Sequence, residues 1–162
     1  MKNITSNPLA SIIKSFTCGA LIGSLCFCSL ISASAASSAK GAMRYVTING
    51  VSFNMQNSLY TGIEGSDSHK YARACTYVGA SQNLNAGNLG TKPMLYNDNG
   101  SIAVNGTWTY STNNISGLSS SVSKTYFSGS PSFYSYGYVN IWDGYNYITY
   151  RPYKTPSLND YT

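Results

Sequence analysis

The sequence predicts an all-β fold, namely a single-domain antiparallel β-sandwich or small barrel of about seven or eight strands behind a helical signal peptide. Three observations predict it. Apolar and polar residues alternate with a period of two through short segments, as in strands that bury one face. Glycine, asparagine and aspartate separate these segments at short intervals, which is typical of turns. No apolar spacing of a helix follows the first 35 residues.

The first 35 residues have the composition of a secretory signal peptide. Lys2 and Lys14 give a basic start, residues 16–31 are mostly apolar, and Ala33-Ser34-Ala35 fits the small-residue pattern at which signal peptidase cleaves. The apolar stretch is shorter than the roughly 20 residues of a membrane-spanning helix. We therefore expect cleavage after residue 35 and a secreted, extracellular protein.

The composition argues against several classes of function. Charged residues make up 9% of the chain and include no basic run, so we expect no nucleic-acid partner. Cys18, Cys26 and Cys28 lie in the signal peptide. Cys75 alone would remain after cleavage, which leaves no internal disulfide framework and no zinc site built from cysteines. We expect Cys75 to be buried in a strand, and the protein to be a monomer without a cofactor.

The first predicted element of the domain is a hairpin of strands 44–48 and 51–55. Asn49-Gly50 lies between the two strands and favours a two-residue turn with positive φ angles. In that register, Ile48 lies opposite Val51. The alternation then places four apolar side chains on one buried face: Val46, Ile48, Val51 and Phe53.

The middle of the chain alternates between turn-rich segments and short strands. Residues 56–69 and 81–90 are rich in glycine, serine and asparagine, which predicts loops. Further strands are expected at 70–78, 91–96, 101–110 and 118–127. The predicted division of the chain is a signal peptide at 1–35, a flexible leader at 36–43, the β-sandwich domain at 44–154 and a C-terminal tail at 155–162.

A second hairpin, over residues 133–151, has one face made mostly of aromatic rings. If Asp143-Gly144 is a two-residue turn, Trp142 pairs with Tyr145, and every second residue outward from the turn shares their face. The opposite face carries core residues such as Val139 and Ile141. The predicted ligand-binding residues, here called the aromatic face, are Tyr134, Tyr136, Tyr138, Asn140, Trp142, Tyr145, Tyr147, Arg151 and Tyr153, and Thr149 shares their side of the hairpin.

The aromatic face has two interpretations at this stage. The rings could be cross-strand pairs that stiffen an exposed sheet, each contributing about 0.2–1 kcal/mol. Alternatively, they bind a glycan, a cell-wall polymer or a partner protein, because tyrosine offers a large contact area at a low cost in conformational entropy. The second interpretation predicts a secreted, non-enzymatic binding module.

The residues that could support catalysis are few and far apart. His69 is the single histidine, and six residues of extended strand would separate it from Cys75 by about 20 Å, too far for a catalytic dyad. No nucleophile motif such as G-x-S-x-G occurs. Asp98 and Asp143 lie in turn sequences, where aspartate has a conformational role. We therefore expect neither catalytic residues nor a metal site.

A secreted antimicrobial or pore-forming factor is the alternative function. A Ser/Thr-rich strand such as Leu118–Tyr126 could rearrange into an amphipathic membrane hairpin. Its apolar face is thin, however, because Ser120 and Lys124 interrupt it, and charged residues on a lipid-facing surface are destabilising. Membrane contact is expected only under this alternative.

Several short motifs lie in the last two-thirds of the chain: Ala86-Gly87-Asn88-Leu89-Gly90, Met94-Leu95-Tyr96 with Gly100, Tyr136-Gly137-Tyr138, Asp143-Gly144-Tyr145-Asn146 and Thr155-Pro156-Ser157. With these motifs the chain resembles small, secreted Tyr/Ser/Gly-rich β-proteins of Gram-positive bacteria. This group has no activity to transfer, so the resemblance implies secretion and a β-fold without assigning a site. The chain is also similar in size, export and composition to secreted β-sandwich bacteriocins.

Overall fold

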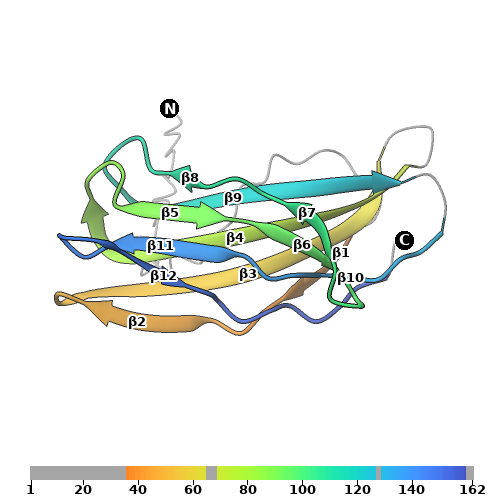
Figure 1. Ribbon diagram of the computed structural model, residues 1–162, viewed down its shortest axis with the longest axis horizontal. Coiled ribbons are helices and arrows are strands. Elements are labelled where there is room, and N and C mark those ends of the chain that lie inside the picture. The colour runs from red at the N-terminus through yellow and green to blue at the C-terminus, as the bar shows by residue number, and fades with distance from the viewer. Residues whose placement is uncertain (1–35, 65–68, 127–128, 160–162) are drawn as a thin grey trace, which may run out of the picture.

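The computed structural model describes residues 36–64, 69–126 and 129–159. The predicted signal peptide falls on residues 1–35, outside the described residues. All the regular structure described is β, in twelve strands that pair antiparallel (Figure 1). This part of the chain has no helix long and apolar enough to cross a membrane.

The first layer is a sheet built on two long central strands. β3 and β4 pair over most of their length, from Phe53 opposite Ala80 to Glu64 opposite His69. β9 lies on the far side of β4, and β1 and β2 lie end to end along the other edge of β3. The bounds are β1 (Ala36–Lys40), β2 (Arg44–Ile48), β3 (Val51–Glu64), β4 (His69–Leu84) and β9 (Ile115–Tyr126).

The predicted turn of the β2–β3 hairpin is confirmed. Ile48 lies opposite Val51, and Val46 lies opposite Phe53. Asn49 and Gly50 have φ angles of 50° and 80°, in the left-handed region that this two-residue turn requires.

Three other segments of the first layer differ from the prediction. Residues 36–40, predicted as part of a flexible leader, form β1 and pair with β3. Residues 56–64, predicted as part of a loop, continue β3. Small polar side chains there suggested a loop, but Asn57 and Thr61 are fully buried within the sheet. Similarly, β4 continues to Leu84, into the predicted loop at 81–90.

The second layer consists of short strands, and two lines of strands in it are interrupted near the middle. Its two parts have the orders β12-β11-β5-β8 and β10-β6-β7. Pro93 alone separates β5 from β6, and residues 136–137 separate β10 from β11, so each pair continues along one line (Figure 1). Proline has no N–H to donate to a sheet. The bounds are β5 (Leu89–Lys92), β6 (Met94–Asn97), β7 (Ile102–Asn105), β8 (Thr109–Tyr110), β10 (Phe133–Ser135), β11 (Tyr138–Trp142) and β12 (Tyr147–Tyr150).

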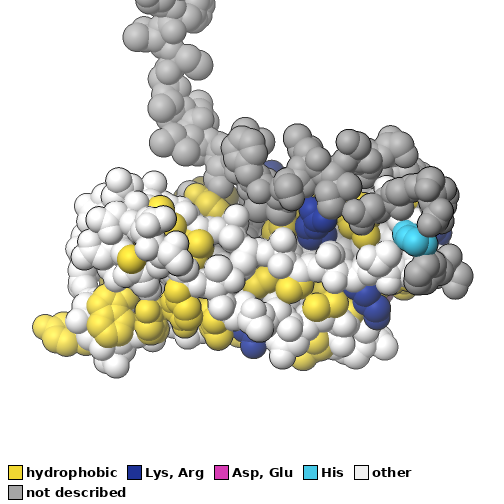
Figure 2. Space-filling view, turned by 90° about the horizontal axis from the view of Figure 1, so that it is seen from above, with side chains coloured by type: hydrophobic (Ala, Val, Ile, Leu, Met, Phe, Trp, Pro, Cys, Tyr) yellow, Lys and Arg dark blue, Asp and Glu magenta, His cyan; other side chains and the backbone are white. Residues whose placement is uncertain are grey.

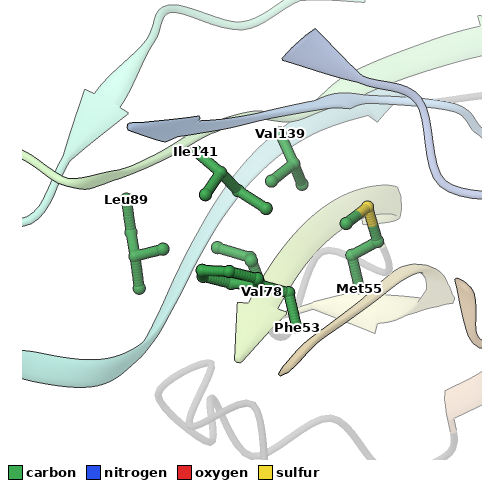
Figure 3. Packing of buried hydrophobic residues seen from close by; sticks show 6 residues of the cluster. All are labelled: Phe53, Met55, Val78, Leu89, Val139 and Ile141. Carbon is green, nitrogen blue, oxygen red and sulfur yellow. The ribbon is translucent and has the colours of Figure 1, made fainter. Parts of the chain in front are cut away.

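The core lies between the layers and contains two apolar clusters. The side chains of the larger cluster point toward one another from β3 and β4 on one side and from β5 and β11 on the other (Figure 3). The described sheets do not close into a barrel, so the arrangement is sandwich-like. The larger cluster consists of Phe53, Met55, Val78, Leu89, Val139 and Ile141, and the smaller one of Leu59, Ala72, Ala74, Leu95 and Phe133.

Buried polar residues separate the two apolar clusters. The Asn57 Oδ1 atom accepts hydrogen bonds from Thr76 Oγ1 at 2.8 Å and from Gly137 N at 3.1 Å. Its Nδ2 atom donates to the carbonyl oxygens of Pro152 at 3.1 Å and Tyr153 at 3.2 Å. The Asn57 amide thus has all four of its hydrogen-bonding positions filled, which offsets the cost of its burial. We call Asn57, Thr76 and Gly137 the polar waist.

Candidate functional site

The loop of the β11–β12 hairpin orients the aromatic face, and it differs from the predicted turn. Asp143-Gly144 is not a two-residue turn, because residues 143–146 form a four-residue loop. The Asp143 Oδ1 atom accepts hydrogen bonds from the backbone N–H of Asn146 at 2.7 Å and of Tyr145 at 2.8 Å. These two bonds favour the ionised carboxylate and lower the pKa of Asp143.

The longer loop changes the cross-strand pairs but not the faces. Trp142 pairs with Tyr147, and Asn140 pairs with Thr149. The predicted pairs Trp142–Tyr145 and Asn140–Tyr147 are therefore wrong. The predicted pairs farther from the turn are not formed either, because Thr149 pairs with Asn140 instead of Tyr138, and β12 ends at Tyr150, before Arg151 and Tyr153. The register differs by two residues, which is an even number, so each side chain keeps its predicted side of the sheet.

One end of the aromatic face is organised around Arg151. The Arg151 guanidinium carbon lies 3.5 Å from the ring centroid of Tyr136, 4.6 Å from that of Tyr138 and 5.7 Å from that of Tyr96. Its Nη2 atom donates to the Tyr96 hydroxyl at 2.8 Å. The Tyr134 ring stacks on that of Tyr96, with a centroid distance of 5.2 Å. We call these five residues the arginine cluster; their ring faces are largely covered by one another and by the guanidinium.

The arginine cluster affects the ionisation of its most buried phenol. Tyr96 is 8% exposed. Burial raises the pKa of its hydroxyl, and the Arg151 charge acts in the opposite direction without cancelling the effect. The Tyr96 hydroxyl therefore stays protonated at neutral pH, as both an acceptor for Arg151 and a donor to the Met94 sulfur at 3.7 Å.

The other end of the aromatic face is exposed. The Tyr147 ring lies with its centroid 5.1 Å from that of Trp142 and 5.2 Å from that of Tyr110, and the Tyr110 centroid is 6.0 Å from that of Trp108. Trp142 and Tyr147 are 36% and 42% exposed. We call these four residues the open cluster. Seen from above the view of Figure 1, hydrophobic side chains follow one margin of the molecule, with lysine and arginine among them (Figure 2).

Hydrogen bonds to neighbouring residues hold two rings of the open cluster, Tyr110 and Tyr147, in place. Asn140 is 7% exposed; its Nδ2 donates to the Tyr110 hydroxyl at 3.0 Å, and its Oδ1 accepts from Thr149 Oγ1 at 2.7 Å. The Tyr147 hydroxyl donates to the Gly87 carbonyl at 2.7 Å. A Cβ atom at Gly90 would lie within 3 Å of the Tyr110 ring, so glycine is what lets this ring lie flat on β5.

The last two predicted site residues lie outside both clusters. Tyr145 is in the hairpin loop and is 85% exposed. Tyr153 follows β12 in the C-terminal segment and is 57% exposed, and its backbone carbonyl belongs to the Asn57 hydrogen-bond network. Both rings are accessible, but the described contacts do not place them against the other rings of the face.

Sequence reasoning missed three aromatic residues of this surface: Tyr96, Trp108 and Tyr110. They come from β6, β8 and the segment before β8, which pair with or lie next to the predicted hairpin only in the folded sheet. Trp108 and Tyr110 are spaced by two. That spacing is the signal that could have placed them on one face.

The strand considered for membrane insertion forms the greater part of β9. Ser119, Ser121, Ser123 and Thr125 are exposed on its outer side, and Val122 packs against the smaller apolar cluster. Lys124 is exposed and follows Val122 at the next position of the same face. The apolar side of this strand is therefore as interrupted in the structure as in the sequence.

The groups on the aromatic face are aromatic rings, hydroxyls, one buried amide and a guanidinium, which contact one another through ring packing, cation–π contacts and hydrogen bonds. Within residues 36–64, 69–126 and 129–159, no three His, Cys, Asp or Glu side chains form a group that could hold a metal ion. Cys75 is buried, as predicted. No protein-family model matches the sequence, and a comparison with curated proteins gives no match.

Proposed function

We propose that the protein is a secreted, non-enzymatic binding module that contacts a glycan with its aromatic face. The observation that carries the proposal is the open cluster. Two tryptophans and two tyrosines form one continuous aromatic surface on the outside of a sheet whose other side packs on the core. Exposed aromatic patches of this kind are typical of interaction sites.

The chemistry of the open cluster suits sugars. The C–H faces of a sugar ring are apolar and pack on aromatic rings, while its hydroxyl edge needs hydrogen-bond partners. The tyrosine hydroxyls and Thr149 lie among the rings and supply such partners. The surface follows a sheet, so it would present several rings to successive units of an extended polymer.

The open cluster is also preorganised. The Tyr147 ring is held by its hydroxyl at the Gly87 carbonyl, and the Tyr110 ring by its hydroxyl at Asn140. Side chains that are ordered before binding lose less conformational entropy when the ligand arrives. This feature favours a recognition surface over rings that merely cover the sheet.

Retention of the purified protein on insoluble polysaccharides and on cell-wall preparations tests the proposal. The double variant Trp142→Ala/Tyr147→Ala should lose binding by about tenfold or more, as expected when central aromatic contacts are removed. Tyr45→Ala is the matched control, because Tyr45 is 73% exposed on β2 in the other layer. Equal retention of the double variant and the wild type, at unchanged thermal stability, would remove the open cluster from the function.

A further inference from the structure

We propose that the glycan is acidic, with carboxylate or phosphate groups next to its sugar rings. This inference rests on the proposed function and specifies its substrate class. It comes from the charges around the aromatic face rather than from the rings themselves.

Three cations lie on or beside the aromatic face. Lys92 in β5 pairs directly with Tyr138, and the alternation of β5 places its side chain on the outer side, opposite to the buried Leu89 and Thr91. The Lys154 ammonium lies 5.3 Å from the Tyr134 ring centroid. With Arg151, these residues form a basic row beside the rings of β10 and β11.

No carboxylate of the described residues neutralises this row. The carboxylates whose side chains the structure describes are Asp98 and Asp143. Asp98 accepts a hydrogen bond from Ser157 Oγ at 2.5 Å, and Asp143 is engaged by the hairpin loop. Neither has an interaction with Lys92, Arg151 or Lys154, so these groups leave the positive charge of the row uncompensated. Lys154 is exposed, whereas the Arg151 guanidinium is packed among the tyrosine rings.

A ligand that fills both parts of the surface must combine an apolar ring face with an anion. The rings of the open cluster favour stacking, and the ammonium groups of Lys92 and Lys154, next to Tyr138 and Tyr134, favour carboxylate or phosphate oxygens. Lysine can place its aliphatic stem along aromatic surface and keep its ammonium in water, which leaves the charge accessible. A neutral glycan would use the rings and leave the basic row unpaired.

Paired polymers test the inference by affinity electrophoresis. Polygalacturonate and its fully methyl-esterified form differ in carboxylate charge, and phosphomannan and mannan differ in phosphate charge. We expect the protein to be retarded more by the charged member of at least one pair, and the pair that responds identifies the anion. The preference should weaken as salt is raised from roughly 0.05 to 0.5 M, because exposed charges are screened.

Two double variants distinguish the contribution of the basic row to binding from the contribution of the protein's net charge. Lys92→Gln/Lys154→Gln should weaken binding to the charged polymer by roughly fivefold to tenfold, while binding to its neutral partner is unchanged. Lys40→Gln/Lys124→Gln removes the same charge from exposed positions of the other layer and should have little effect. Equal losses in both double variants would overturn the inference, as would equal binding of charged and neutral polymers.

The same experiment keeps the two proposals apart. Binding to charged and neutral polymers alike, abolished by Trp142→Ala/Tyr147→Ala, would leave the proposed function standing and remove only the anionic ligand. Binding to charged polymers that survives Trp142→Ala/Tyr147→Ala would show a purely ionic contact and overturn both. Binding to neither member of either pair would overturn the inference that the ligand is acidic.

Discussion

The arginine cluster and the open cluster lie on one face of the same layer and have similar compositions, yet they differ in what covers their rings. In the arginine cluster, a guanidinium lies 3.5 Å from the Tyr136 ring centroid, and Tyr96 is almost fully buried. In the open cluster, Trp142 and Tyr147 contact each other edge to face and remain exposed. A row of aromatic residues thus contains a part whose rings are covered and a part whose rings remain exposed.

The interruption between β10 and β11 produces this difference. At Tyr136 the backbone N–H donates to the Met94 carbonyl at 3.2 Å, and at Gly137 the chain approaches the first layer closely enough to reach Asn57. The rings before and after this point converge on Arg151. Beyond it, β11 is a regular strand, and its last outer side chain, Trp142, contacts Tyr147 and remains exposed.

Gly137→Ala should have the largest effect. A Cβ atom there would meet Thr76 Oγ1 and the Lys92 carbonyl, and such overpacking within a buried hydrogen-bond network should cost about 3 kcal/mol of unfolding free energy. Gly117→Ala is the control, because its Cβ would have only ordinary contact with Tyr77. Urea denaturation measures both. Equal stability of the two variants would show that the close approach of Gly137 to the first layer does not contribute to the stability of the fold.

Arg151→Met should come next, with a loss of about 2 kcal/mol of unfolding free energy, since it removes the cation–π contacts and the hydrogen bond to Tyr96. Lys154→Met removes an exposed cation near Tyr134 and should change stability by less than about 0.5 kcal/mol. The comparison is made by urea denaturation at neutral pH. If the two variants were equally stable, the arginine cluster would be no more structural than the open one.

The smallest effect should follow protonation of Asp143 in the loop beside the open cluster. The pKa of this carboxyl is lowered below its usual 3.8 in the folded protein. Its stabilisation is therefore present at pH values above the unfolded pKa and is lost as pH falls through the lower, folded pKa. In an NMR titration, the Tyr145 and Asn146 amide signals should shift with a midpoint below 3.8. A midpoint at or above this value would contradict the hydrogen bonds described, and Asp143→Asn should abolish the titration.

Alternation in the sequence was sufficient to place side chains on faces. Every second residue from Tyr134 to Trp142 falls on the outer side as predicted, while Val139 and Ile141 between them face the core, because side chains of a strand alternate with a period of two. The loop was not predictable in this way, since Asp143-Gly144 suits both a two-residue turn and the start of a longer loop held by the aspartate. The division into two clusters was not predictable either, because Tyr96 and Tyr110 approach from strands distant in the sequence.

The long central strands were harder to predict than the hairpins. Asn57 and Thr61 lie in a segment whose composition is typical of a loop, and their neighbours in the sequence do not show that they are buried. The hydrogen-bond partners that make burial possible for Asn57 include Gly137, which is 80 positions away, and Pro152, which is 95 positions away. The residues around Asn57 carry no information about partners so far away in the sequence, so a buried polar strand is mistaken for a loop.

The polar waist also has a consequence for the order of folding. Asn57 acquires its full set of partners only when Pro152 and Tyr153 arrive, and Leu158 then pairs with Phe133. Until those residues are in place, the centre of β3 holds an amide whose partners are missing, which penalises a partly assembled sandwich. We therefore expect folding to be slow and all-or-none, with the last strand-like segment of the chain completing a core that its first strands began.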